Sequence, residues 1–151
     1  LPGSFQAYIG MPVILRHMNI STELGITNGA CGFLRKLNTS IDDNGLTYCT
    51  SALVEFPDSK VQLSDLPPHY FPIEPTMWKC TTSITDESGT KIQVILYRQQ
   101  LPLQPGFAST AIFAQGKSMP TLLCDLHKGQ YYAYVAASRA TSRDGLFITK
   151  P

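Results

Sequence analysis

The chain has 151 residues, a formal net charge of +1, 43% hydrophobic residues and 15% charged residues. This length fits one domain or one and a half small ones, and the hydrophobic share is enough to bury a core. The near-zero net charge excludes a general electrostatic attraction to DNA, so any nucleic-acid contact has to be local.

The first hundred residues have the pattern of short strands separated by turns. Turn signals lie at Asn28-Gly29, which favours a hairpin, at Asp43-Asn44-Gly45 and at Glu87-Ser88-Gly89. The proline-rich segment Leu66–Pro72 cannot be helical and is expected to be an extended connector. Strands are predicted at residues 8–15, 31–37, 51–56, 78–84 and 91–97. Several short strands at regular spacing predict a small barrel.

After Gln100 the pattern changes to an alternation of strand and helix. Helices are predicted at residues 108–115 and 130–140, a buried strand at 121–126 and a final strand at 146–149. This alternation is typical of the end of a parallel α/β sheet, although it supplies too few strands for a complete one.

Four cysteines are widely scattered, at Cys31, Cys49, Cys80 and Cys124. Because no pair has the C-x-x-C spacing of metal sites, we expect reduced and mostly buried thiols rather than a zinc site. No apolar run is long enough to span a membrane, so no membrane partner is expected. The chain opens with Leu1 rather than Met, which suggests a piece of a longer protein.

The stretch Ala111–Ser118 resembles a phosphate-binding loop, with Ala in place of the first Gly. Such a loop follows a buried strand and precedes a helix. Here the segment before it carries two prolines, Pro102 and Pro105, and Pro120 follows closely. A self-sufficient phosphate-loop enzyme, with Lys117 on the nucleotide, is therefore a disfavoured alternative.

Three stretches together resemble the petite-integration-frequency and RecD-like DNA helicases of superfamily one, particularly fungal or Helitron-like versions. The first stretch is IGMPVIL at 9–15 followed by GITNGACG at 25–32. The second, QLPLQPGFAST at 100–110 running into AQGKS at 114–118, looks like helicase motif V. The third, YVAASR at 134–139 followed by SRDGL at 142–146, looks like motif VI.

The resemblance implies a mixed β and α/β fold: a small SH3-like β-barrel followed by the C-terminal part of a RecA-like parallel α/β domain. Residues 1–99 would be the barrel inserted in the second motor domain, and residues 100–151 the end of that domain. The chain would be the C-terminal fragment of an ATP-dependent 5′–3′ DNA helicase, inactive by itself. Helicases of this kind are linked to DNA repair, recombination and telomere maintenance, which implies a nuclear or mitochondrial location.

The same resemblance assigns roles to individual residues. Arg139 would be the arginine finger, which stabilises charge during phosphoryl transfer, as opposed to a solvated arginine at a helix end. The residues on the nucleotide side would be Gln115, Gly116, Lys117 and Arg143. For Arg143, however, a purely structural role in the turn is favoured over a role at the nucleotide. ATP and Mg²⁺ would bind the complete enzyme, between this domain and an upstream motor domain, and not this fragment alone.

For DNA, Thr110 would contact a phosphate, and Arg35, Lys36 and Arg98 are the candidate cations, with single-stranded DNA or a fork as the partner. One rival is a single-stranded nucleic-acid-binding barrel, in which Phe33 and Tyr97 add stacking surface to the three cations. Another is a degenerate mobile-element relic. Ile112 and Phe113 support the relic, because the family has a His and a basic or small polar residue at these positions.

Overall fold

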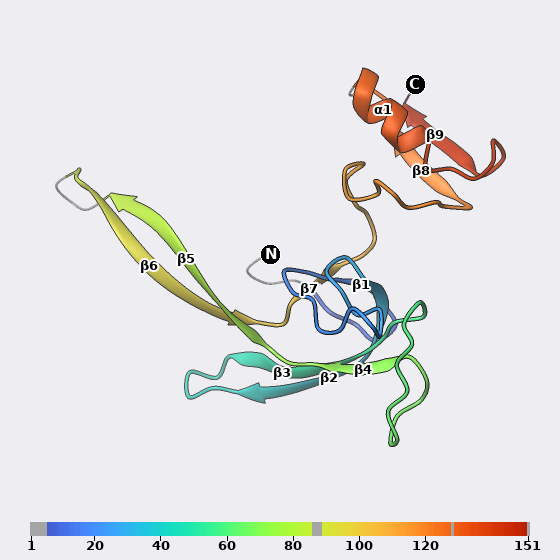
Figure 1. Cartoon of the computed structure of the whole chain (residues 1–151). Helices are drawn as coiled ribbons and strands as arrows, with labels where there is room; N and C mark the ends of the chain where they lie inside the picture. The colour runs from blue at the N-terminus through green and yellow to red at the C-terminus, as the bar shows by residue number, and fades with distance from the viewer. Residues whose placement is uncertain (1–5, 86–88, 128, 151) are drawn as a thin grey trace. The chain divides into compact units, whose positions relative to one another are not determined.

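The computed structural model describes residues 6–85, 89–127 and 129–150, so the turn predicted at Glu87–Gly89 lies largely outside the described residues. Within these ranges the chain forms antiparallel sheets, one small parallel sheet and one short helix (Figure 1). In chain order, the elements are β1 (Pro12–Leu15), β2 (Cys31–Ile41), β3 (Thr47–Glu55), β4 (Tyr70–Ile73), β5 (Thr76–Thr85), β6 (Lys91–Gln100), β7 (Leu103–Pro105), β8 (Leu122–Asp125), α1 (Gln130–Ala137) and β9 (Leu146–Lys150).

The chain divides into two compact units, Leu1–Phe107 and Ala108–Pro151. The division follows Phe107, because β7 pairs with β1 and so belongs to the first unit. The two units are described separately below.

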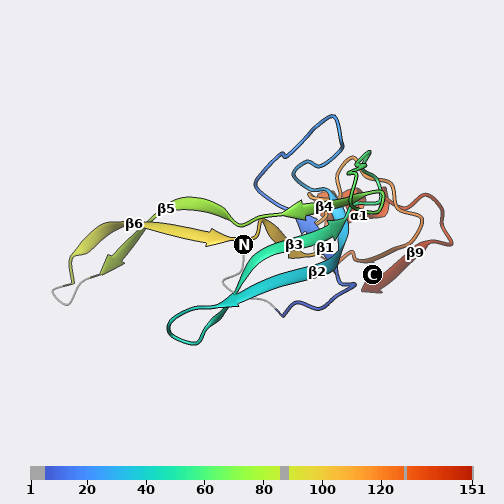
Figure 2. The same ribbon diagram turned by 90° about the horizontal axis from the view of Figure 1, so that it is seen from below.

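The first unit contains an antiparallel sheet of five strands, in the order β4-β3-β2-β1-β7. β5 and β6 pair only with each other, over ten residue pairs from Thr76↔Gln100 to Thr85↔Lys91, and both views show this ribbon extending beyond the sheet (Figure 1 and Figure 2). A barrel closes only when its first and last strands pair. Among the described residues the edge strands β4 and β7 do not pair, so the predicted β-rich module is confirmed but a closed barrel is not formed.

The core of the first unit lies on one face of the five-stranded sheet. Residues of a strand point alternately to opposite faces, and the buried residues of β2 and β3 follow that period. Loop residues such as Ile26 and Phe56 cover this face from outside the strands. The buried cluster consists of Met11, Val13, Leu15, Ile26, Leu34, Ala52, Val54, Phe56, Val61, Ile73, Leu101 and Leu103.

The Asn28-Gly29 turn does not form the predicted tight hairpin. β1 and β2 pair through Ile14↔Cys31, so the connection between them is the whole loop 16–30. Gly29 has φ of +92°, whereas Asn28 is not among the residues with positive φ, and a type I′ turn needs both. Tertiary hydrogen bonds decide the turn instead, including one from the Gly29 N–H to the Leu15 carbonyl at 2.8 Å. The turn predicted at Asp43–Gly45, by contrast, is confirmed, and it joins β2 to β3.

The proline-rich connector is not helical, as predicted, but it is extended only from Tyr70, where strand β4 begins. Before that, residues 68–69 form a turn in which the Tyr70 N–H donates to the Pro67 carbonyl at 3.3 Å, and His69 has a φ of +70°. Pro72 lies opposite Leu53 of β3. Proline has no N–H to donate, and β4 tolerates it because this strand is an edge of the sheet.

The second unit contains the parallel pair β8–β9, with α1 between the two strands in sequence. This confirms the predicted β/α alternation in a small parallel sheet, with two corrections. Residues 111–116 form turns, not a helix, because the segment is short and Gly116 ends it at φ of +81°. The strand predicted to be buried is β8, but its residues are half-buried or exposed.

Candidate nucleic-acid and nucleotide interface

Two consecutive cations of β2, Arg35 and Lys36, are both exposed. Neighbouring residues in a regular strand point to opposite faces, so this arrangement needs an irregularity. The pairing passes from Leu34↔Val54 to Lys36↔Leu53, which leaves Arg35 as the extra residue of a β-bulge. A bulge reorients side chains, and here it leaves both cations exposed.

Arg35 already has an acidic partner. Its Nε donates a hydrogen bond to Oε2 of Glu55 at 2.6 Å, and the two side chains form an ion pair. The guanidinium carbon also lies 5.5 Å from the ring centroid of Phe33. The hydrogen bond with Glu55 raises the pKa of Arg35, with burial opposing it. Any phosphate bound at this site would have to compete with the Glu55 carboxylate.

The remaining residues of the rival stacking surface lie apart from one another. Phe33, on the five-stranded sheet, is 39% exposed and so is not a core residue. Tyr97 and Arg98 lie on β6 of the ribbon. As successive residues of a strand, they point to opposite faces, so one face of the ribbon cannot present both.

Thr110 stabilises the first turn of the second unit. Its Oγ1 accepts the Phe113 N–H at 3.2 Å and its carbonyl accepts the Ala114 N–H at 3.1 Å. Gln115 and Gly116 are exposed at the end of this turn. Nζ of Lys117 lies 4.4 Å from the ring centroid of Phe113. No helix of the described chain follows Lys117 directly, so these residues do not have the strand–loop–helix geometry of a phosphate-binding loop.

Arg139 follows the C-terminal end of α1 and folds back onto it. Its Nε donates to the Val135 carbonyl at 3.1 Å, and its Nη2 donates to Oγ of Ser138 at 2.9 Å. The last carbonyls of a helix lack intrahelical donors, and a cation there also interacts favourably with the helix dipole. In this conformation Arg139 caps the helix, and two of its donor atoms are engaged by the chain itself.

The two helicase-like stretches of this unit lie side by side in the structure. The Met119 N–H donates to the Arg139 carbonyl at 2.8 Å, and the Thr141 N–H donates to the Met119 carbonyl at 3.0 Å. Gln115 to Ser118 therefore lead directly into the segment that is bonded to Arg139. Arg143 is exposed in the next turn, where its carbonyl accepts the Leu146 N–H at 3.2 Å.

The expectation of mostly buried thiols was wrong, since Cys31 and Cys80 are exposed and Cys49 and Cys124 are half-buried. Partial burial raises the pKa of the Cys49 and Cys124 thiols. Across the described ranges, no three His, Cys, Asp or Glu side chains are grouped so that they could hold a metal ion. No described helix combines the length and the apolar character needed to cross a bilayer.

Sequence reasoning did not single out Trp78 and His17, whose ring centroids lie 6.1 Å apart at the start of the ribbon. The available signal was that Trp78 is the one tryptophan of the sequence and lies on a predicted strand. Its contact with His17 could not be predicted, because it joins a loop to a strand far along the chain.

The fold defined by these elements matches part of one class of solved structures, the Pif1 helicases. No protein-family model and no curated protein matches the sequence. Among solved structures, Bacteroides Pif1 bound to ssDNA matches 93% of this chain with a TM-score of 0.59 and 17% identity. The chain covers 28% of that protein.

Two further structures give the same result. The Pif1 helicase from Candida albicans matches 94% of the chain with a TM-score of 0.58 and 22% identity, and the chain covers 32% of it. Bacteroides Pif1 in complex with ADP-AlF3 and ssDNA matches 95% with a TM-score of 0.60 and 16% identity, and 29% of it is covered. The resemblance to petite-integration-frequency helicases is thus confirmed at the level of the fold: most of this chain folds like a part of Pif1 that makes up less than a third of that protein.

Proposed function

We propose that this chain forms part of an ATP-dependent 5′–3′ DNA helicase. The observation that carries the proposal is the structural match to Pif1 over more than nine-tenths of the chain. In this proposal residues 1–99 are an SH3-like module inserted in the second motor domain, and residues 100–151 are the end of that domain. Its partner is single-stranded DNA or a fork. Nuclear or mitochondrial localisation and roles in repair, recombination and telomere maintenance belong to the same proposal.

Within this enzyme, Arg139 is the arginine finger, and Gln115, Gly116, Lys117 and Arg143 are on the nucleotide side. The pairing of Met119 with Arg139 supports this grouping, because it holds both helicase-like stretches in one small unit. ATP and Mg²⁺ bind between this domain and the upstream motor domain. The guanidinium of Arg139 then has to leave the Val135 carbonyl and Ser138 Oγ to reach a phosphate.

The exposed face of the parallel pair also supports a larger domain. Leu123 and Phe147 are opposite each other on β8 and β9 and are 67% and 53% exposed. Parallel sheets are normally covered on both faces, and apolar residues of this size are costly to leave in water. The rest of the motor domain would cover this face.

The arginine finger is tested in a polypeptide in which an upstream motor domain precedes this chain. We expect Arg139→Ala to lower ssDNA-stimulated ATP turnover about a thousandfold. Arg139→Lys should not rescue it, because an ammonium lacks the planar fork of donors. Affinity for ssDNA without nucleotide should stay within about twofold. Turnover unchanged in Arg139→Ala would contradict this role, whereas the chain alone should show no turnover with or without Lys117→Ala.

A second candidate is a single-stranded nucleic-acid-binding module without catalysis, and the bulge that exposes both Arg35 and Lys36 favours it. In that case the chain alone binds oligonucleotides, and Lys36→Ala weakens binding and reduces its salt dependence. Full binding by the chain, together with normal ATP turnover of the Arg139→Ala polypeptide, would favour this module over the helicase. A degenerate relic would show neither binding nor turnover.

A further inference from the structure

The contact between Trp78 and His17 gives the start of the β5–β6 ribbon an exposed aromatic site. The two rings are nearly perpendicular, at 76°, with centroids 6.1 Å apart. A perpendicular contact uses at most one face of the indole. Trp78 is half-buried and His17 is exposed, so ring surface remains accessible to a planar ligand.

His17 is held in this position by a conformation that side chains other than glycine seldom adopt. Its φ is +65°, in the left-handed region. Its N–H donates to Oδ1 of Asn28 at 3.1 Å, and the Asn28 N–H donates to Oδ1 of Asn19 at 2.8 Å. Strain of this kind persists only where the surroundings enforce it, and it is concentrated at binding sites.

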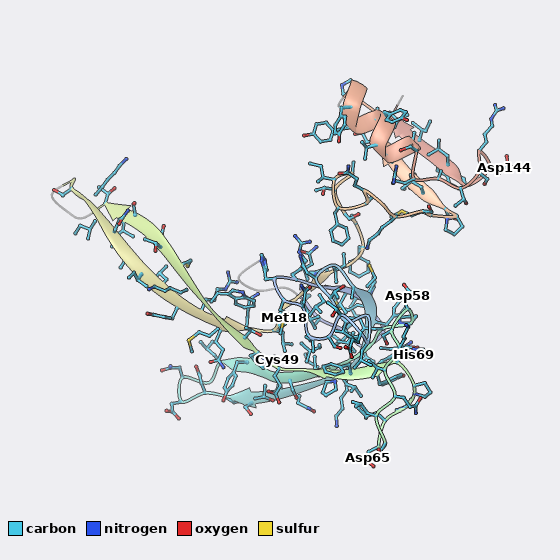
Figure 3. The ribbon with its side chains drawn as sticks, viewed as in Figure 1. Met18, Cys49, Asp58, Asp65, His69 and Asp144 are labelled. Carbon is cyan, nitrogen blue, oxygen red and sulfur yellow. The ribbon has the colours of Figure 1, made fainter. Side chains whose placement is uncertain are left out.

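The loop that carries His17 is also fixed to the beginning of the ribbon. Oγ1 of Thr76 donates to Sδ of Met18 at 3.6 Å; the Met18 side chain is labelled in Figure 3. Thr76 precedes Trp78 by two residues on β5, so both side chains lie on the same face of the ribbon. The hydrogen bond between Thr76 and Met18 therefore helps to hold the loop, and with it His17, next to Trp78.

A cation completes the site. Arg98 of β6 is directly opposite Trp78 in the antiparallel register, and opposite residues share one face with their Cβ atoms about 5 Å apart. An aromatic ring that stacks on a base, next to a guanidinium that meets a phosphate, is the combination by which proteins hold single strands independently of sequence.

We propose that Trp78, flanked by His17 and Arg98, forms a stacking site for one base of a single-stranded nucleic acid. The site rests on the proposed function, because it adds a defined base contact to the DNA-binding surface of the helicase. Tyr97 has no part in it, since its side chain points to the other face of the ribbon.

The test uses the intrinsic fluorescence of the full chain, because its one tryptophan reports on this site alone. Binding of a labelled oligothymidine is followed by anisotropy, and Trp78 emission is followed in parallel. A second oligomer of the same length carries abasic sites, so that it keeps the phosphates and lacks the bases. We expect oligothymidine to quench Trp78 and the abasic oligomer to leave its emission nearly unchanged.

Variants separate stacking from folding. Trp78→Ala should weaken oligothymidine binding about tenfold, and Trp78→Phe should recover most of it because a ring remains. His17→Gly removes one ring and relieves the positive φ, so it should weaken binding while raising the Tm. If His17→Gly lowers the Tm and leaves the affinity for oligothymidine unchanged, His17 has only a structural role, and its part in the stacking site is overturned.

The possible results distinguish the site from the proposed function. Binding with quenching that needs the bases supports both. Binding without quenching, or equal quenching by the abasic oligomer, overturns the stacking site and leaves the DNA-binding function intact. No binding of either oligomer overturns both for this chain.

Discussion

Met119 and Arg139 are joined through their backbones, with the Met119 N–H donating to the Arg139 carbonyl at 2.8 Å. The return bond runs from the Thr141 N–H to the Met119 carbonyl at 3.0 Å, which makes a short parallel bridge beside the β8–β9 pair. Because the bonds use backbone groups, they do not depend on the side chain at either position. Substitutions of Arg139 thus change its guanidinium chemistry without removing the connection between the two helicase-like stretches.

Replacing Gly145 by alanine should destabilise the second unit. An added Cβ would lie 1.9 Å from the Pro120 carbonyl oxygen, where no real Cβ contact occurs, and the obstacle is backbone that cannot rotate away. We expect a loss of about 2–3 kcal/mol in the free energy of unfolding, as for other overpacked sites. Urea unfolding measures it, with faster amide exchange at Leu122, whose N–H donates to the Gly145 carbonyl. Asp144→Ala at the exposed neighbouring position is the control, and equal stability of the two variants would disprove the close approach.

Arg139 should contribute to stability apart from any role in catalysis. Arg139→Ala removes the donors to the Val135 carbonyl and to Ser138 Oγ at the end of α1. The expected loss is about 1 kcal/mol, typical of a cation at a helix C-terminus. Thermal unfolding followed by circular dichroism tests it against Arg143→Ala, which removes the same charge from an exposed turn. If both variants unfold alike, the capping role is wrong.

Glu55→Gln should strengthen binding of single-stranded oligonucleotides. The substitution removes the carboxylate that pairs with Arg35, so the guanidinium no longer has to leave an ion pair to meet a phosphate. The slope of log affinity against log salt concentration should steepen by about 0.7 for one additional phosphate contact. Glu74→Gln, at an exposed position of the same unit, changes the net charge equally and is the control. A similar gain in both variants would mean that only net charge matters.

The Cys49 thiol should make stability fall in alkaline solution. Burial raises the pKa of Cys49 above its ordinary value of 9.0, so the folded state keeps a proton that the unfolded state releases. Its stabilising contribution is complete below pH 9 and is lost as pH rises through the raised pKa. Urea unfolding is measured from about pH 8 to about pH 10.5, a range that spans the titration of a free thiol. The free energy of unfolding should fall less over this range in Cys49→Ser than in the unsubstituted chain.

The exposed Cys31 should also be alkylated faster than Cys49 at about pH 8, as measured by mass spectrometry.

Sequence patterns predicted the strands of the first unit well where local signals agree with the final pairing. The Asp43–Gly45 turn joins β2 and β3 as expected, because the strands on either side of it pair with each other. The Asn28-Gly29 signal predicted the wrong connection, since β1 and β2 pair across a long loop that tertiary hydrogen bonds hold. The 108–115 segment is too short to offset the cost of starting a helix and is followed by Gly116 at a φ of +81°, so residues 111–116 form turns.

The sequence by itself determined the order of strands and turns, the β/α alternation after Gln100 and the resemblance to one helicase family, because these depend on residues close together in the chain. Only the tertiary structure decided that the five-stranded sheet stays open, that a bulge exposes Arg35 together with Lys36, and that His17 meets Trp78. Those features arise from pairings between distant segments. Their register is set by which faces the folded chain can bury, and a local pattern does not contain that information.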